Sequence, residues 1–228
     1  MYAFLKWVMR SAVHLVLFGK WRLTGAEHMP RDGPVLVCSN HIGTLDPPLV
    51  PAFLPRRDTW SVAKKEYWNN PVTGWIFSRY HAFPIVRHSA DRAAVKRMTE
   101  VLRDDHVLVI YPEGTRITSG GLRRPEPGAG FIAKLTRAPV VPVALAGTRD
   151  VLPKGTLIPH RRVMEMHIGR AFTIPERRPD GSKVDNQAAA DAIMVAIAEL
   201  LPRPELRGDF ADLDYWQAKV GDLRCYDQ

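Results

Sequence analysis

Short apolar runs alternate with longer stretches of helical periodicity from residue 35 onward. The runs have the length of strands, whereas the stretches between them repeat apolar residues with the period of a helix. The predicted strands cover residues 35–38, 60–63, 82–86, 107–111 and 140–146, with helices near 49–54, 71–79, 90–103 and 128–137 between them. This alternation is typical of a largely parallel sheet flanked by helices, so we expect an α/β fold.

The remainder of the chain adds weaker signals. Residues 161–172 resemble another strand, and residues 185–201 repeat Ala and Ile with the period of a helix. Five aspartates make the stretch after Pro202 acidic, and it carries no recognisable motif. We therefore predict an α/β domain over residues 21–202, between a helix at 1–20 and an acidic tail at 203–228.

The first 18 residues predict an amphipathic helix. Lys6, Arg10 and His14 recur every four residues and form one narrow stripe, while apolar residues, including Trp7 and Phe18, cover most of the remaining circumference. Such a helix can lie in a bilayer surface with its basic stripe reaching the headgroups. The alternative is an ordinary helix packed on its own domain.

Composition narrows the class of protein. Of 228 residues, 46% are apolar and 25% charged, which excludes disorder of the whole chain and favours a soluble or peripheral globular protein. The net charge of +8 favours an anionic partner: nucleic acid, an anionic bilayer or a phosphorylated substrate. No window supplies the roughly 20 apolar residues of a spanning helix, and no signal peptide is expected. Two distant cysteines, Cys38 and Cys225, indicate a reducing compartment.

A histidine and an aspartate stand five residues apart directly after the first predicted strand. Residues 39–47 are Ser-Asn-His-Ile-Gly-Thr-Leu-Asp-Pro, with His41 at the carboxyl end of the strand and Asp46 at the start of the next helix. Open α/β sheets bind ligands at that edge. Asp46 can accept the Nδ1 hydrogen of His41, which leaves Nε2 as a general base. This chemistry suits proton removal from a substrate hydroxyl, without a nucleophile from the enzyme.

Other interpretations of this segment stay open. Asp46 before Pro47 is also typical of a helix N-cap followed by proline, and a single histidine at a strand end is often structural. A zinc site is less favoured, because no second His or Cys stands at a metal-ligand spacing.

A second polar segment follows the predicted strand over 107–111. Residues 112–116 are Pro-Glu-Gly-Thr-Arg. Gly114 permits a tight turn, Thr115 and exposed amides can donate hydrogen bonds, and Arg116 can bind a phosphate through two parallel N–H groups. The alternative is a turn that leads into a solvated loop.

A third strand end contributes another cation. The run from Phe83 to Arg87 ends the predicted strand over 82–86. We expect Arg87 and Arg116 at the carboxyl ends of neighbouring strands, beside His41. Three strand ends would then meet at one cleft, and this convergence favours an active site more than any single motif does.

These residues resemble the lysophosphatidate acyltransferase family, glycerolipid acyltransferases with an N-H-x4-D motif. The match comprises Asn40, His41 and Asp46, the runs 83–87 and 113–116, and Val-Val-Pro-Val at 140–143, and it covers roughly residues 1–150. The resemblance implies direct attack of a hydroxyl on an acyl-CoA or acyl carrier protein thioester, with no acyl-enzyme, metal or tightly held cofactor. It also implies that Arg87 and Arg116 bind the acceptor phosphate and that the amino terminus is membrane-associated.

The sequence departs from the family at two places. Many members have Ser where this chain has Gly43, and many have a basic residue just before the glycine that corresponds to Gly128, where this chain has Pro-Glu-Pro at 125–127. The choice of acceptor therefore stays open. Residues 63–66, Ala-Lys-Lys-Glu, resemble a further family element. Lys65 would add positive potential near the cleft, or belong to a solvated pair of lysines.

We therefore expect an acyltransferase of phospholipid synthesis at the cytoplasmic face of the cell membrane. The expected roles are base for His41, orientation of His41 for Asp46, and acceptor binding for Lys65, Arg87, Glu113, Gly114, Thr115 and Arg116. Alternatives are transfer to glycerol 3-phosphate or another lysolipid, and a non-catalytic membrane-binding protein. Nucleic-acid binding is disfavoured, because the arginine pairs are scattered and no binding module is recognisable.

Overall fold

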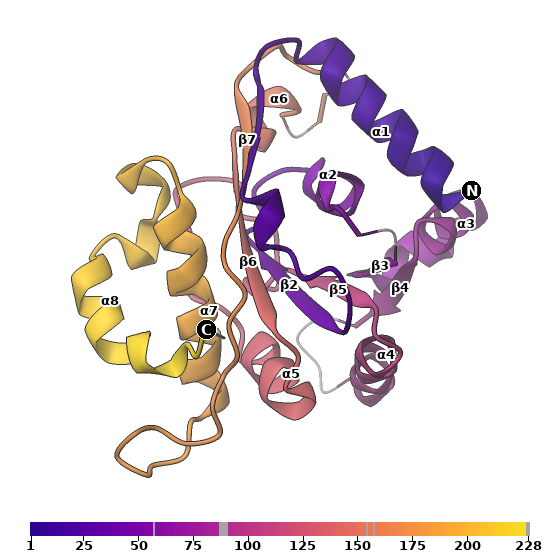
Figure 1. Cartoon of the computed structure of the whole chain (residues 1–228). Coiled ribbons are helices and arrows are strands. Elements are labelled where there is room, and N and C mark those ends of the chain that lie inside the picture. Colours follow the sequence, from indigo (N-terminus) through magenta and orange to yellow (C-terminus); the bar gives the residue numbers. More distant parts are fainter. Residues whose placement is uncertain (57, 87–90, 154, 157, 227–228) are drawn as a thin grey trace.

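A seven-stranded sheet forms the centre of the molecule (Figure 1). The computed structural model describes residues 1–56, 58–86, 91–153, 155–156 and 158–226. The strands are β1 (Trp21–Thr24), β2 (Val35–Ser39), β3 (Thr59–Lys64), β4 (Ala82–Ile85), β5 (Val107–Ile110), β6 (Val140–Ala146) and β7 (Met164–Ile168). The α-helices are α1 (Tyr2–Val16), α2 (Asp46–Phe53), α3 (Pro71–Arg79), α4 (Arg92–Arg103), α5 (Gly128–Thr136), α6 (Thr148–Val151), α7 (Asn186–Leu200) and α8 (Leu213–Val220).

The sheet is mostly parallel, which confirms the predicted α/β fold. Its order is β1-β7-β6-β2-β5-β3-β4. The strands from β6 to β4 pair in parallel, whereas β7 is antiparallel to β6 and pairs in parallel with β1. The strand expected at 161–172 is the shorter β7, and β1 was not predicted. Because β2 lies between β6 and β5, the loops after these three strands are adjacent at the carboxyl edge.

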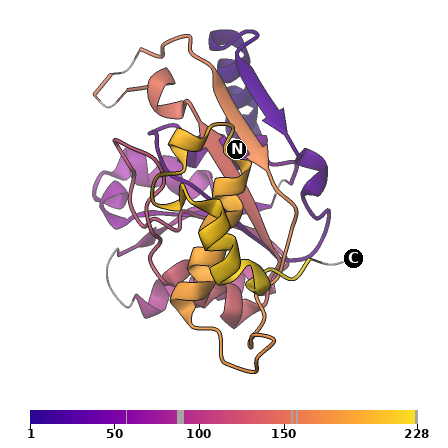
Figure 2. The same ribbon diagram turned by 90° about the vertical axis from the view of Figure 1, so that its left-hand side faces the viewer.

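The strands are buried on both faces, and alternate residues belong to two different cores. Leu36 and Cys38 of β2 pack with residues of α4, α5 and α7, whereas Val35 and Val37 pack with residues of α1 and α2. All five residues of β2 are buried, as expected of a strand covered by helices on both sides. Figure 2 shows α7 and α8 lying in front of the sheet on one face.

Helix α1 forms where it was predicted, but its basic stripe faces the protein. Nζ of Lys6 donates to the carbonyls of Leu54 and Arg56, at 3.3 and 2.8 Å, and Nε of Arg10 donates to that of Ala52 at 2.6 Å. These carbonyls stand at the end of α2, where cations are favourable. The expectation that this stripe reaches lipid headgroups is therefore wrong for Lys6, which is buried. No helix in the described ranges has both the length and the apolar character to span a bilayer.

The segment after Pro202 packs against α7. Phe210, Trp216, Val220 and Leu223 belong to the same core as α5 and α7. Residue Cys225 also forms an isolated antiparallel bridge with Thr173. The division of the chain at residues 20 and 202 stays a prediction.

Candidate active site

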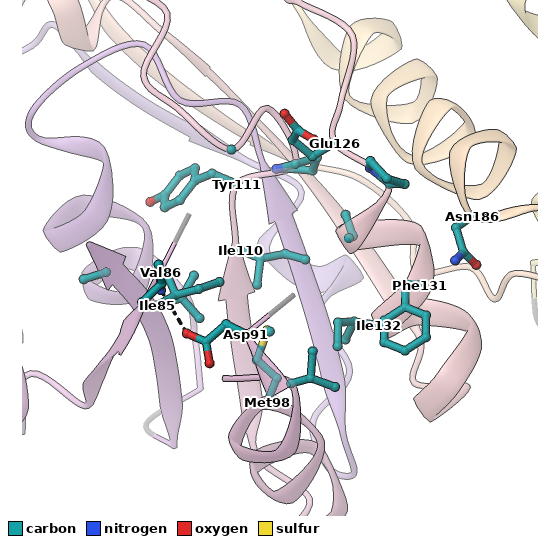
Figure 3. Close-up of a pocket in the computed structure, with 18 of the residues that line it drawn as sticks. Ile85, Val86, Asp91, Met98, Ile110, Tyr111, Glu126, Phe131, Ile132 and Asn186 are labelled. Carbon is teal, nitrogen blue, oxygen red and sulfur yellow. Dashed lines mark hydrogen bonds between the residues drawn. The ribbon is translucent and has the colours of Figure 1, made fainter. Parts of the chain in front are cut away.

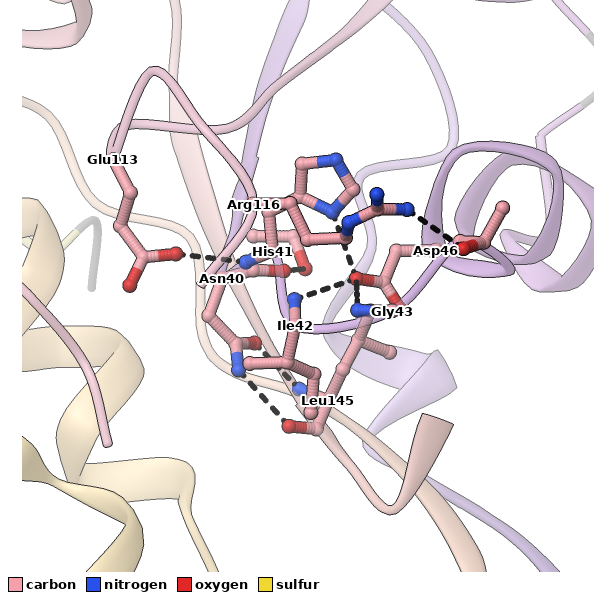
Figure 4. Close-up of polar contacts among 10 residues, drawn as sticks. Asn40, His41, Ile42, Gly43, Asp46, Glu113, Arg116 and Leu145 are labelled. Atoms are coloured by element: carbon pink, nitrogen blue, oxygen red, sulfur yellow. Dashed lines mark hydrogen bonds and ion pairs between the residues drawn. The ribbon is translucent and has the colours of Figure 1, made fainter. Parts of the chain in front are cut away.

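The loop after β2 brings His41 and Asp46 together (Figure 4). Oδ2 of Asp46 lies 2.8 Å from Nδ1 of His41 and 2.7 Å from the backbone nitrogens of both Ile42 and Gly43. The carboxylate is fully buried, and the His41 side chain is 9% exposed. Since Oδ2 of Asp46 already accepts from two backbone N–H groups, Nδ1 of His41 is the donor in this pair, and in the neutral imidazole Nε2 is the nitrogen that can accept a proton.

The prolines after Asp46 explain why its carboxylate points back to the loop. Pro47 and Pro48 are the next residues of α2 and have no backbone N–H, so the first turn offers the carboxylate no donor there. The N-cap position belongs to Leu45, and Asp46 makes no side-chain capping bond. The N-cap interpretation of Asp46 is therefore wrong, and the interpretation as partner of His41 matches the geometry.

The loop after β5 fixes the backbone of His41 from both sides. Oε2 of Glu113 accepts from the backbone N–H of His41 at 2.8 Å, and the N–H of Ile117 donates to the carbonyl oxygen of His41 at 2.7 Å. Oε1 of Glu113 accepts from the N–H of Arg123 at 3.1 Å. Burial raises the pKa of Glu113 from 4.5 to about 7, although both N–H donors act to lower it. Glu113 thus joins two loops while its charge is poorly solvated.

Two further residues complete the support of His41, and sequence patterns gave no role to either. The Asn40 side chain pairs with the backbone of Leu145 in β6, donating to its oxygen at 2.9 Å and accepting from its nitrogen at 2.7 Å. The ring of Tyr111 lies 4.4 Å from that of His41, and burial raises the Tyr111 pKa well above its ordinary value. Asn40 was named as part of the motif but given no role, whereas nothing marked Tyr111.

The backbone amides beside His41 are all occupied. The N–H of His41 is bound to Glu113, and those of Ile42 and Gly43 are bound to Asp46. These three groups are therefore not available to stabilise an oxyanion in this arrangement. Gly43 also has a packing reason to lack a side chain, because an added Cβ would lie 2.6 Å from Oγ1 of Thr148.

Of the other predicted site residues, Arg116 contacts the His41 loop, and the structure also describes Gly114, Thr115 and Lys65. Nη1 of Arg116 donates to Oγ1 of Thr44 at 2.6 Å, which attaches it to the His41 loop (Figure 4). Gly114 has a φ of +67°, a left-handed conformation that favours glycine, and Thr115 is exposed. Lys65 is exposed just after β3.

Arg87 lies outside the described residues. The strand before it, β4, is separated from β5 by β3. The strands that precede Arg87 and Arg116 are therefore not neighbours, contrary to expectation.

A cavity of about 880 Å³ extends from His41 between the sheet and two helices (Figure 3). Figure 3 shows Tyr111 near one end, Met98 near the other and Ile110 between them. The ring contact between Tyr111 and His41 places the histidine at the Tyr111 end. Most of the wall is apolar and comes from β3, β4, β5, α4 and α5: Val62, Ala63, Ile85, Val95, Met98, Ile110, Ala129, Phe131 and Ile132. The sequence gave no sign of this cavity, because its wall is assembled from distant segments.

A second cavity, of about 230 Å³, borders the residues that directly follow His41. It is lined by Ile42, Gly43, Thr44, Arg116, Thr118, Arg149, Leu152 and Pro153. The larger cavity is therefore mainly apolar, and the smaller one carries two guanidinium groups. Within the described part of the chain, no three His, Cys, Asp or Glu side chains gather in a way that could hold a metal ion.

Comparisons with known proteins agree on one class of enzyme. A family model described as Acyltransferase matches residues 20–146. The chain is 28% identical over 149 residues to 1-acyl-sn-glycerol-3-phosphate acyltransferase of Bacillus subtilis (strain 168), covering 64% of this chain and 73% of that protein. It is 30% identical over 150 residues to the chloroplastic 1-acyl-sn-glycerol-3-phosphate acyltransferase BAT2 of Brassica napus, covering 64% of this chain but 43% of that one.

A solved structure has the same fold. The crystal structure of PlsC, the 1-acyl-sn-glycerophosphate (LPA) acyltransferase from Thermotoga maritima, aligns with a TM-score of 0.67 and 22% sequence identity. The alignment covers 87% of this chain and 79% of that chain. At this identity the likeness concerns the fold.

Proposed function

Since the chain belongs to the acyltransferase family, we propose that it transfers a fatty acyl group from a thioester to the free hydroxyl of lysophosphatidate. The family resemblance expected from the motifs is confirmed. The acceptor is proposed because the bacterial and plant relatives are named for it. Acyl-CoA or an acyl carrier protein is the proposed donor, and both offer the same thioester chemistry.

The observation that carries this proposal is the buried His41–Asp46 pair at one end of an apolar cavity. Asp46 accepts the Nδ1 hydrogen at 2.8 Å, so Nε2 is the atom of His41 that can take a proton. A general base in this position removes the proton of the acceptor hydroxyl as its oxygen attacks the thioester carbonyl. Collapse of the tetrahedral intermediate breaks the C–S bond. The proton then passes from His41 to the departing thiolate, which leaves an ester and a free thiol.

Two cavities, one lined by His41 and one by the residues that follow it, suit the two substrates of this reaction. The apolar wall of the larger cavity suits a fatty acyl chain, whose burial contributes about 0.8 kcal/mol per methylene group. The smaller cavity offers Arg116 to a phosphorylated headgroup. We propose that His41 acts where the acyl thioester in the first cavity meets the acceptor hydroxyl from the second. Roles for Lys65 and Arg87 in acceptor binding remain proposals.

We also propose that the apolar face of α1 rests on a membrane surface. Phe4, Trp7 and Leu15 are 58%, 63% and 83% exposed, and Phe18, just beyond the helix, is 77% exposed. Aromatic and aliphatic side chains of this kind enter the headgroup region of a bilayer. Because Lys6 and Arg10 face α2, attraction to anionic lipid must come from other cations of this basic protein.

An acceptor panel with thiol detection tests the proposed function. The purified chain is incubated with palmitoyl-CoA or palmitoylated acyl carrier protein and, separately, lysophosphatidate, glycerol 3-phosphate or a monoacylglycerol. We expect thiol release and phosphatidate formation with lysophosphatidate and little of either with monoacylglycerol. Thiol release only with glycerol 3-phosphate would show that this compound, and not lysophosphatidate, is the acceptor. No thiol release with any acceptor would contradict acyl transfer to these acceptors.

A further inference from the structure

The smaller cavity has two arginines, and only one of them belongs to a motif that the sequence singled out. Arg116 follows β5, whereas Arg149 lies in α6, directly after β6. The strands β5, β2 and β6 are consecutive in the sheet. The loops that carry Arg116, His41 and Arg149 therefore stand side by side at the carboxyl edge, with the His41 loop between the two arginines.

One donor atom of Arg149, Nη1, is buried without an acceptor in the described part of the protein. Burying a donor of a charged group without an acceptor is costly, so an anion that accepts from it would stabilise the site. The guanidinium of Arg116 is oriented by Thr44, to which its Nη1 donates at 2.6 Å, and its remaining donors are not used by that bond.

The size of the cavity limits what it can accommodate. Its volume of about 230 Å³ is roughly a quarter of the 880 Å³ of the larger cavity. This is enough for a phosphate with a short polyol and too little for a long acyl chain as well. Two hydroxyl groups, those of Thr44 and Thr118, add neutral hydrogen-bonding groups to the wall. The cavity thus combines positive charge, hydroxyl groups and a small volume.

We infer that Arg149 and Arg116 together bind the phosphate monoester of the acceptor lipid in this cavity. This inference rests on the proposed function and adds a residue that neither the motifs nor the family model, which ends at residue 146, includes. A guanidinium presents two parallel donors to phosphate oxygens, and two such groups match the two negative charges of the dianion. Bound there, the phosphate would lie beside Ile42, Gly43 and Thr44, the residues that directly follow His41.

Kinetics of Arg149→Gln and Arg149→Lys test this inference. In Arg149→Gln, kcat/KM for lysophosphatidate should fall about ten- to a hundredfold, the effect of losing one charge-assisted contact. The fall should come mainly from a higher acceptor KM, while the donor KM stays as in the wild type. Arg149→Lys keeps the charge but loses the paired donors, so its kcat/KM for lysophosphatidate should fall by a smaller factor. Turnover of a monoacylglycerol, which has no phosphate, should not change.

Arg103→Gln is the matched control for the lost charge. Arg103 is the exposed last residue of α4 and precedes β5, so it lies at the opposite edge of the sheet. This variant should match the wild type for every substrate. Melting curves of all variants check the fold, and should Arg149→Gln fail to fold, Arg149→Lys decides. Acceptor kinetics unchanged in a folded Arg149 variant, or a higher KM for the acyl donor alone, would overturn the inference.

A binding measurement separates this inference from the proposed function. Glycerol 3-phosphate and inorganic phosphate are titrated calorimetrically into the wild type, Arg149→Gln and Arg103→Gln. We expect at least tenfold weaker binding of glycerol 3-phosphate to Arg149→Gln alone. If the wild type acylates no acceptor, the proposed function fails, while this loss of binding would still support the anion site. Equal binding to all three proteins would refute it.

Discussion

At the scale of single residues, His41 and Asp46 have different duties although they form one pair. Within the described part of the chain, the His41 side chain makes one hydrogen bond, whereas Asp46 also accepts from the backbone N–H groups of Ile42 and Gly43. His41→Ala should lower kcat about 10²- to 10⁴-fold, the usual contribution of a general base, with a small effect on the free energy of unfolding. Asp46→Ala should lower both kcat and the free energy of unfolding. It leaves two backbone N–H groups without an acceptor, and each such group costs about 1–3 kcal/mol.

Thiol-release kinetics and urea unfolding of the two variants check this difference. A folded His41→Ala protein with near wild-type kcat would show that another group accepts the proton. An Asp46→Ala protein as stable as the wild type would show that its backbone contacts are replaceable.

The raised pKa of Glu113 predicts a pH dependence of stability. Between pH 4.5 and about 7 the folded protein retains a proton that this side chain has lost in the unfolded chain. The unfolding free energy should therefore fall as pH rises through this window. One pKa unit corresponds to ~1.4 kcal/mol, so the rise from 4.5 to about 7 makes the loss from Glu113 at most about 3.5 kcal/mol.

Glu113→Gln, which does not titrate, reveals this effect when its urea unfolding is compared with that of the wild type from pH 4.5 to 7.5. The wild type should lose stability relative to the variant as pH rises. Glu205→Gln is the control, since Glu205 is exposed and forms an ion pair with the exposed Arg203. A constant difference between wild type and Glu113→Gln across this range would mean that the side chain ionises normally.

At the scale of elements, the sequence predicted what depends on periodicity and missed what depends on tertiary contacts. The strand over 140–146 and the helix over 71–79 form with the predicted bounds, because each has a clear apolar pattern and clear ends. Strand β1 has four residues at the edge of the sheet, and two apolar positions cannot define a period. The basic stripe of α1 was recognised, but its direction depends on the carbonyl groups at the end of α2, which no local pattern reveals.

The orientation of α1 gives a prediction with two opposite outcomes. Lys6→Ala combined with Arg10→Ala should lower the unfolding free energy by about 2 kcal/mol or more, since charge-assisted hydrogen bonds to buried carbonyls are lost, and should leave vesicle binding unchanged. Phe4→Ser combined with Trp7→Ser should weaken vesicle binding and leave the unfolding free energy nearly unchanged. Both side chains are more than half exposed, so stability should change by about 0.5 kcal/mol or less.

Urea unfolding and co-sedimentation with vesicles that contain anionic phospholipid measure the two effects. Vesicle binding that depends on Lys6 and Arg10 but not on the aromatic residues would restore the original expectation of a headgroup-facing stripe.

At the scale of the whole molecule, the active-site loop depends on residues far away in the sequence. The N–H of Leu122 donates to Leu206, and the N–H of Asp209 donates back to Leu122, which ties the loop after Arg116 to the carboxyl-terminal segment. Nη2 of Arg124 contacts the buried carboxylate of Asp191 in α7 at 2.7 Å. The sequence singled out the loops after β2 and β5, which meet at His41. It could not indicate these supports, because they join segments more than 60 residues apart.

The larger cavity is lined by residues from distant segments of the chain. Its length should limit the length of the acyl chain that the protein accepts. Val95 of α4 is half-buried and faces this cavity. In Val95→Phe the ring would occupy space that long chains use. Each methylene that no longer fits forfeits about 0.8 kcal/mol of burial, so a donor two methylenes too long should lose roughly tenfold in kcat/KM. Short donors should react as before.

Val95→Ala is the matched variant, because it widens the same position and should leave long-chain donors at least as reactive as in the wild type. The measurement is kcat/KM for saturated acyl-CoA donors of roughly eight to eighteen carbons, at a fixed concentration of lysophosphatidate. If both variants keep the wild-type profile, the acyl chain does not bind beside Val95. If Val95→Phe lowers kcat/KM equally for all donors, the ring disturbs the site in a way that does not depend on the length of the acyl chain. A loss confined to long donors in Val95→Phe alone is the result that this cavity predicts, because only a chain reaching from His41 past α4 would meet the added ring.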